Sequence, residues 1–443
     1  MPSAVDENNA TCGAQKADFT PDEKLAMLRR FEPAVRFTRG EQFFPMDVDR
    51  YLAASSLWVA HPGKADRELV SQGGLSIDLL TLPRRDSFDA IYYLKFIDPP
   101  DLVELARYTL ERTVKSLTGK DEDGFFAGVG RLARVGYFSR LADAFFSLTL
   151  VLRGRVPGDT AAAAAMAYQK MQSESERYTY YGRVERQNGW VILQYWYFYA
   201  FNNWRSGFYG VNDHEGDWEM VCIYCSEDST STDMPAQDRL LPQWAAYASH
   251  DFAGDDLRRR WDDPELEKEG DHPIIYVGAG SHASYFTAGE YLAELEVPIL
   301  QPLVRIGDLL LAFWARTLRQ AGLNEDFGGF NVFRIPFVDY ARGDGAKIGV
   351  GGTRDWTPAL LDDATAWAAD YHGLWGLYAN DPVSGENAPA GPVYNRDGSI
   401  RQSWCDPLGW AGLDKLPPPE RMGSTVQAQI AQTKERQQVL MEE

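Results

Sequence analysis

The amino-acid sequence predicts an α+β, mainly β fold: a central antiparallel β-sandwich with helical insertions and a helical C-terminal tail. The clearest sign is the aromatic and aliphatic run that begins at Trp190, which is typical of a strand buried on both faces. The dipeptide Asn188-Gly189 separates this run from the β-prone segment 177–186 and indicates a two-residue type I′ hairpin. Further strand-like runs follow at 217–225, 242–249 and 273–280. Short strands joined by turns favour a sandwich over a parallel sheet.

The first hundred residues are expected to open with a disordered lead over residues 1–20, which are mostly polar. Thr20 then caps a short helix whose first helical position is Pro21. Strands are expected within 33–52, where apolar and polar residues alternate, and at 89–96.

Helical excursions are expected to decorate this sandwich within a single domain spanning residues 21–415. The first excursion, at about 101–172, opens with apolar residues spaced three or four apart. The second excursion covers about 298–320. Residues 416–443 are expected to form a polar helical tail with a thin apolar stripe.

Four further segments are assigned by composition. The acidic segment 251–271 predicts an exposed excursion, and the Gly-rich segment 322–355 predicts a loop. Residues 358–371 are expected to form a short helix. The tryptophans of the Gly- and Pro-rich segment 380–413 indicate an ordered loop that packs on the body of the protein.

The overall charge narrows the classes of partner. The chain of 443 residues carries a net charge of −20, which argues against nucleic acid because phosphate contacts need clustered Lys and Arg. The same charge suits a protein that attracts cations. No apolar run approaches the ~20 residues that span a bilayer, so no transmembrane segment is expected and peripheral membrane contact stays open.

The first residues and the cysteines indicate a compartment. The N-terminal segment lacks the basic start and apolar core of a signal peptide. The four cysteines are scattered, and Cys222 and Cys225 would face opposite sides of a strand as reduced core thiols. A cytoplasmic location is therefore expected, with non-classical export left open.

The hexapeptide His214-Glu215-Gly216-Asp217-Trp218-Glu219 carries the candidate site. In an extended run, Asp217 and Glu219 point to the same side, with the His214 imidazole just upstream. Two carboxylates and an imidazole are suitable ligands for a divalent cation, and Trp218 should point into the core. Carboxylate oxygens plus water favour Ca²⁺ or Mg²⁺ over Zn²⁺ or Mn²⁺.

Two more histidines are expected near this hexapeptide. The chain has six histidines, and both His250 and His282 end apolar runs that read as strands. Antiparallel strands of similar length align their ends, so we expect these two side chains to converge with His214, Asp217 and Glu219. They would order the water molecules around the cation, or bind it directly.

The residues also resemble a known family. The string HEGDWE, together with the segments PAVRFTRGEQFFPMDVDRYL, HPIIYVGAGSHASYF and GPVYNRDGSIRQSWCDPLGWAG, resembles the vacuolar-protein-sorting-associated family sixty-two. That family is distantly similar to the necrosis- and ethylene-inducing peptide-like cytolysins. These are β-sandwiches whose GHRHDWE motif helps to hold a divalent cation used in binding sphingolipid head groups.

The resemblance to the cytolysins implies further site residues. His214, Asp217 and Glu219 keep the spacing of the cytolysin motif, whereas Gly216 replaces its second histidine. The aspartate expected upstream is not evident, and Asn202 or Asn203 occupies roughly its place. An amide oxygen contributes no charge, so weaker cation affinity is expected.

Three hypotheses about function follow. The leading one is a non-enzymatic, divalent-cation-containing binding protein that engages a glycan, a lipid head group or a protein partner. The alternative is a metal-dependent hydrolase, in which a bound metal activates water and His250 or His282 acts as the base. In the third, the acidic and histidine residues form an internal hydrogen-bond network without a metal.

Overall fold

The computed structural model describes residues 19–84, 89–97, 160–203, 213–228, 233–248, 258–295, 335–378 and 387–416. Several predictions lie outside these residues. They are most of the N-terminal lead, the first excursion up to residue 159, the second excursion at 298–320, the C-terminal tail from residue 417, and His250.

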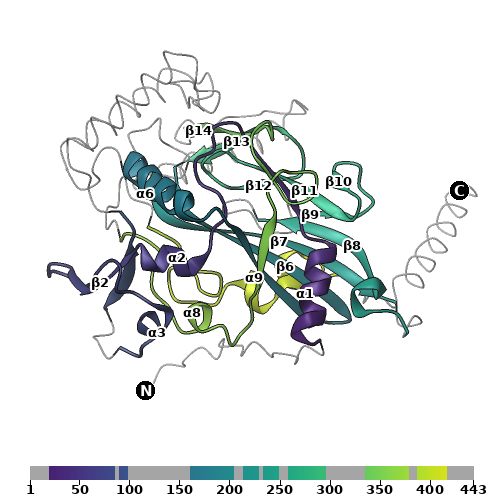
Figure 1. The fold of residues 1–443 in the computed structure, drawn as a ribbon. Coiled ribbons are helices and arrows are strands. Elements are labelled where there is room, and N and C mark those ends of the chain that lie inside the picture. Colours follow the sequence, from purple (N-terminus) through teal and green to yellow (C-terminus); the bar gives the residue numbers. More distant parts are fainter. Residues whose placement is uncertain are drawn as a thin grey trace, which may run out of the picture.

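The predicted β-rich fold is confirmed, and a six-stranded sheet forms its centre (Figure 1). The strand order is β16-β5-β6-β7-β8-β9, and every pair except β16–β5 is antiparallel. The strands are β16 (Trp356–Leu360), β5 (Tyr178–Gln187), β6 (Trp190–Asn202), β7 (His214–Glu227), β8 (Leu240–Tyr247) and β9 (Arg258–Arg260).

The hairpin between β5 and β6 has the predicted two-residue turn. Gln187 pairs with Trp190, and the two residues between them have positive φ angles, 48° at Asn188 and 81° at Gly189. This is the type I′ conformation, which Asn-Gly adopts at low cost. All residues of β6 are buried, as expected for a strand covered on both faces.

A second sheet covers one face of this central sheet. It has the order β10-β11-β1-β15, with β12 paired to β11. Its strands are β1 (Ala34–Phe37), β10 (Lys268–Glu269), β11 (His272–Val277), β12 (Ser284–Tyr285) and β15 (Lys347–Ile348). Val35 and Ile275 of this sheet pack with Tyr195 and Tyr197 of β6 in one core. The two layers form the sandwich, and α1 (Pro21–Arg30) closes one end of it (Figure 1).

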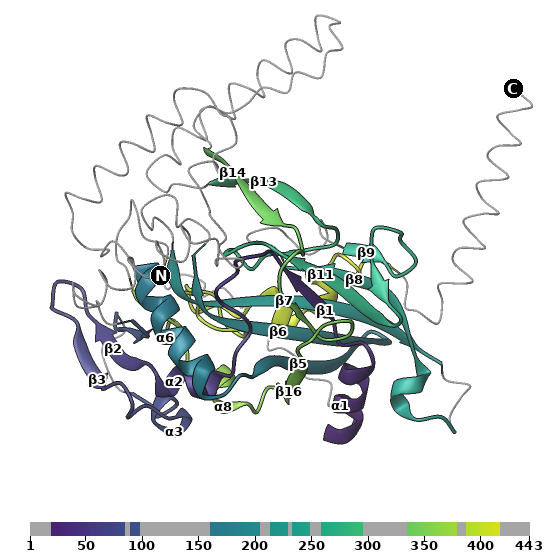
Figure 2. The same cartoon turned by 45° about the horizontal axis from the view of Figure 1, so that its top comes forward.

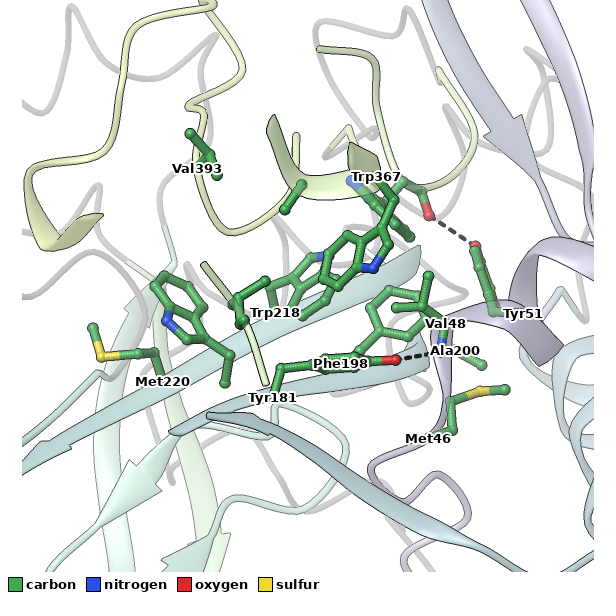
Figure 3. Close-up of a cluster of buried hydrophobic side chains, with 14 of the residues drawn as sticks. Met46, Val48, Tyr51, Tyr181, Phe198, Ala200, Trp218, Met220, Trp367 and Val393 are labelled. Atoms are coloured by element: carbon green, nitrogen blue, oxygen red, sulfur yellow. Dashed lines mark hydrogen bonds between the residues drawn. The ribbon is translucent and has the colours of Figure 1, made fainter. Parts of the chain in front are cut away.

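The other face of the central sheet carries a second, aromatic core (Figure 3). Trp218 stacks on Trp367 with ring centroids 5.4 Å apart, and Trp375 meets both rings edge-on. Helices and the C-terminal segment supply the remaining cover: α2 (Val48–Ala53), α3 (Ile77–Leu80), α6 (Thr160–Glu174), α8 (Ala366–Ala369), α9 (Gln402–Cys405) and α10 (Pro407–Trp410). The predicted packing role of Trp218 and the predicted ordered loop ending at 413 both agree with this arrangement.

Two smaller sheets complete the described fold. The order β3-β2-β4 joins β2 (Ser56–Ala60), β3 (Arg67–Val70) and β4 (Ile91–Lys95) beside the aromatic core. Strands β13 (Gly289–Leu295) and β14 (Ile335–Ala341) form a hairpin-like pair that stands out from the larger sheets in Figure 2. A 3₁₀ turn, η1, spans Ala236–Arg239.

Two predictions of local structure are wrong. The segment 322–355 contains β14 and β15, because the glycines from Gly343 onward lie in the turns before and after β15 and not within a strand. The start of the expected helix at 358–371 belongs to β16, where Pro358 is tolerated because β16 is an edge strand, and only α8 is helical. In contrast, the described part of the segment 251–271 agrees with the predicted exposed excursion: from residue 258 onward all its residues except Leu266 are exposed or half-buried, although it includes the short strands β9 and β10.

Other local predictions are confirmed. Thr20 and Glu23 form a reciprocal capping box at the start of α1, with Pro21 in the first turn. Cys222 and Cys225 are free, buried thiols that lie in the two different cores. None of the helices in the described part of the chain combines the length and apolar character that a membrane span requires.

Candidate functional site

The candidate residues gather where β6 ends and β7 begins. In this antiparallel pair Asn202 lies opposite His214, Tyr199 opposite Asp217, and Tyr197 opposite Glu219. Tyr197 and Tyr199 belong to the sandwich core, so Asp217 and Glu219 share the face that looks toward the second sheet. The predicted shared face of the two carboxylates is therefore present.

Gly216 interrupts the alternation of β7. Its φ angle is +65°, and a Cβ atom there would lie 2.2 Å from the Trp375 carbonyl oxygen. This left-handed residue sends Glu215 to the aromatic side of the sheet, where its carboxylate accepts hydrogen bonds from the backbone N–H groups of Phe96 (2.9 Å), Ile97 (3.0 Å) and Leu377 (3.1 Å). Glu215 thus anchors two distant segments and is separate from the carboxylates on the sandwich side.

Asp217 is held by two side chains through one oxygen. His282 Nδ1 lies 2.9 Å from Asp217 Oδ2, and Asn202 Nδ2 donates to the same oxygen at 2.9 Å. Burial alone would raise the pKa of Asp217, but the His282 hydrogen bond and the nearby His214 and His282 charges lower it below its usual value. Asp217 is therefore ionised at neutral pH, and its Oδ1 accepts no hydrogen bond from any described residue.

His282 is buried between two acids. Its side chain is fully buried, and its ring stacks on Tyr199 with centroids 3.8 Å apart. Nε2 lies 3.7 Å from Glu41 Oε1, on the side opposite Asp217. Burial would lower the pKa of His282, but Asp217 and Glu41 raise it to about 9, so the ring is protonated at neutral pH. We call Asp217, His282 and Glu41 the carboxylate–imidazolium triad.

Sequence reasoning did not identify Glu41. Its side chain is 2% exposed, and its carboxylate lies against the turn that carries His282. Burial would raise the pKa of Glu41, but His282 and the backbone donors lower it below its usual value. Glu41 follows a glycine in a loop without periodicity, and its partner is far away in the chain, so no local pattern marks it.

His214 presents one ring nitrogen as a possible ligand. Its Nδ1 lies 2.8 Å from the Gly216 carbonyl oxygen, which can only accept. Nδ1 therefore carries the hydrogen, and in the neutral ring Nε2 keeps its lone pair. Metal-binding histidines usually donate their other ring N–H in this way, often to a backbone carbonyl.

The remaining candidates contribute differently. Glu219 is buried. Burial raises the pKa of Tyr199 well above its usual value, and the neighbouring Tyr197 and Glu219 raise it further. Asn203 donates its backbone N–H to Gly280 O at 3.0 Å. Among the described residues, no three His, Cys, Asp or Glu side chains converge closely enough to hold a metal by themselves. A cation here would be held by one or two side chains and by water.

The raised pKa values of Glu215 and His282 predict that the free energy of unfolding falls as pH rises. Burial raises the pKa of Glu215 from 4.5 to about 7, so the folded state binds a proton that the unfolded state has already lost. Stabilisation by protonated His282 is complete below pH 6.5 and is lost as pH rises through about 9. We expect the free energy of unfolding, measured by urea titration, to fall by about 3 kcal/mol for each group between pH 4.5 and 9.

A variant separates the two contributions to this profile. Glu215→Gln should flatten the part of the profile between pH 4.5 and 7 and leave the His282 part in place. A stability that instead rises steadily from pH 5 to 8 would contradict both assignments.

Comparisons with known proteins find little similarity to this chain. No family model and no curated protein matches the chain, so nothing supports the vacuolar-protein-sorting resemblance. Two solved structures are similar, and both are necrosis- and ethylene-inducing peptide-like proteins. "NLPPya in complex with mannosamine" is 16% identical with a TM-score of 0.16, covering 22% of this chain and 38% of that chain. "Crystal structure of non-toxic HaNLP3 protein" is 14% identical with a TM-score of 0.17, covering 23% and 40%. The chain thus spans about two fifths of the length of these structures.

Proposed function

We propose that this chain is a non-enzymatic binding protein that holds a hydrated divalent cation at the start of β7. The observation that carries the proposal is the state of Asp217. Its carboxylate is ionised and oriented through Oδ2, while Oδ1 has no hydrogen-bond partner among the described residues and the side chain is 10% exposed. A fixed anionic oxygen of this kind is what a hard cation binds.

Two further groups support a cation at Asp217. The hydrogen bond of His214 Nδ1 to the Gly216 carbonyl leaves Nε2 as the ring nitrogen that can face a ligand, and Glu219 lies on the same face of β7. A site with one or two protein ligands suits Mg²⁺ or Ca²⁺, because these cations retain several water molecules. Zn²⁺ or Mn²⁺ would be expected in a more closed set of protein ligands.

The class of ligand follows from the remaining coordination positions. Ca²⁺ takes six to eight oxygens, so water molecules on such a cation can be exchanged for hydroxyl or phosphate oxygens. Glycans and lipid head groups are rich in these oxygens, and a carboxylate of a protein partner is the third candidate. A glycan or a lipid head group is therefore the first candidate ligand, because it presents many hydroxyl or phosphate oxygens that can replace water on the cation.

The alternative, a metal-dependent hydrolase, is less well supported. His282 was one of two candidate bases, but it is fully buried and its pKa is raised to about 9. A ring that is already protonated at neutral pH cannot accept a proton from water. The other candidate, His250, lies outside the described residues.

Chelation and substitution test the cation. Added Ca²⁺ or Mg²⁺ at a hundredfold excess over Kd should stabilise the chelator-treated protein by about 2.7 kcal/mol in thermal or urea unfolding. Asp217→Asn should abolish this response, and should also cost about 1–3 kcal/mol in chelator because His282 loses its charged partner. His214→Ala should reduce the response and leave the triad intact.

A matched control uses an acid away from the site. Asp262 pairs with Arg260 on the surface, and Asp262→Asn should keep the full cation response. The proposal is wrong if the parent protein unfolds identically in Ca²⁺, in Mg²⁺ and in chelator. If the parent protein does respond to the cation, glycan-array binding that requires the cation would identify the ligand class.

A further inference from the structure

The turn that carries His282 is conformationally strained. His282 has a φ angle of +58°, which is uncommon for a residue other than glycine, and Gly280 has a φ of +73°. The turn is closed by a hydrogen bond from His282 N to Gly278 O at 3.0 Å. Such a conformation persists only where surrounding contacts hold it.

Glu41 supplies contacts from outside the turn. Its Oε2 accepts a hydrogen bond from Gly280 N at 2.8 Å, and its Oε1 lies 3.7 Å from His282 Nε2. The end of β6 holds the same residue through its next peptide group, because Asn203 N donates to Gly280 O at 3.0 Å. Gly280 is thus clamped between the loop after β1 and the end of β6.

Glu41 is itself fixed. Its Oε1 accepts hydrogen bonds from the backbone N–H groups of Gln42 (2.8 Å) and Phe43 (3.0 Å). Phe43 packs against Phe201 near the end of β6, with ring centroids 5.6 Å apart. A buried carboxylate with three backbone donors has little freedom to move, so its position determines that of the turn.

We propose that Glu41 is a positioning residue of the cation site, acting through His282 on Asp217. Glu41 holds the turn at Gly280 and faces Nε2 of His282. The ring is thereby oriented so that its Nδ1 makes the hydrogen bond to Asp217 Oδ2. This fixes the carboxylate plane and leaves Oδ1 as the oxygen for the cation. The proposal rests on the proposed cation function, and it links the β1 loop to the start of β7.

The test compares Glu41→Gln with Glu32→Gln. Glu32 is a suitable control because it is also largely buried near β1 and accepts a hydrogen bond from Tyr180 at 3.0 Å, away from the site. By calorimetric titration, Glu41→Gln should bind Mg²⁺ or Ca²⁺ roughly 10–100-fold more weakly than the parent, as for other groups that orient a metal ligand. Glu32→Gln should bind as the parent does.

A second readout needs no cation. In ¹⁵N-histidine-labelled protein, the His282 Nδ1–H bonded to Asp217 should give a downfield proton signal, assigned by its loss in Asp217→Asn. We expect Glu41→Gln to shift or broaden this signal and Glu32→Gln to leave it unchanged. Glu41→Asp keeps the charge but withdraws it by one methylene, and it serves in the same two measurements if Glu41→Gln does not fold.

The outcomes separate the two proposals. If the parent protein binds no cation, the proposed function fails, and the Nδ1–H signal alone decides whether Glu41 positions Asp217. If the parent binds a cation, and the Glu41 variants keep both its affinity and the Nδ1–H signal, the positioning role of Glu41 is wrong.

Discussion

Replacing His282 with alanine is expected to lower the free energy of unfolding by about 3–5 kcal/mol at neutral pH. The substitution leaves Asp217 and Glu41 buried near each other without the cationic ring that lies between them. It also removes the ring that stacks on Tyr199 at 3.8 Å. Urea unfolding at pH 7 measures the loss.

Two comparisons isolate the cause of this loss. His282→Asn tolerates the positive φ angle better than alanine, so a similar loss in both variants assigns the effect to the missing charge and ring. His272 is only partly buried, with Nδ1 2.9 Å from the Glu32 carbonyl oxygen, and His272→Ala should cost about 1 kcal/mol. A loss below 1 kcal/mol for His282→Ala would show that the triad contributes little to stability.

Replacing Gly216 with alanine is expected to cost about 3–5 kcal/mol or to prevent folding. The new Cβ would lie 2.2 Å from Trp375 O and 3.0 Å from the Trp375 carbonyl carbon, so backbone must move. The φ angle of +65° adds about 1–2 kcal/mol of strain for any residue with a Cβ. Thermal unfolding, with near-ultraviolet circular dichroism of the tryptophans, measures the effect.

Gly63 offers a matched control for the Gly216 variant. Its φ angle is +72°, but a Cβ atom there would meet nothing within 4 Å. Gly63→Ala should therefore cost only the strain of about 1–2 kcal/mol. Equal losses at the two positions would mean that the approach of Trp375 has no energetic weight.

The Gly216 geometry also explains a difference noted in the sequence. The cytolysin motif has a histidine where this chain has Gly216, and no side chain fits there because the Trp375 backbone occupies the space. The neighbouring Gly376 shows the same constraint, since a Cβ on it would lie 2.2 Å from Glu215 O. Close backbone contact with residues 375 and 376 therefore fixes the chain on both sides of Gly216.

The sequence predicted features that depend on local chemistry. Asn188-Gly189 identified the hairpin because few dipeptides adopt two consecutive positive φ angles. The reciprocal bonds of Thr20 and Glu23 follow from a capping pattern read over four residues. The approach of His282 to Asp217 was expected because both residues lie where an apolar run meets a polar turn, and the two side chains are in hydrogen-bond contact.

Features that depend on distant parts of the chain were missed. Glu41 enters the site because the loop after β1 passes under the His282 turn, and no pattern around residue 41 indicates this. The fate of Glu215 was hidden because one left-handed glycine reverses the side on which it lies. Residues from Pro358 onward were expected to form a helix, whereas Pro358–Leu360 belong to β16, an edge strand that tolerates proline.

The two parallel strand pairs have a consequence for the order of folding. Ala34 of β1 pairs with Ile274 of β11, and Tyr178 of β5 pairs with Trp356 of β16. Contacts between residues so far apart in the chain form slowly, because a long loop must close before they are made. During synthesis the β5–β6–β7 hairpins can form early, while β1 waits for β11 and the edge of β5 waits for β16. Until then β1 and the edge of β5 remain unpaired, and such strand edges are the places where a partly folded chain can pair wrongly with another chain.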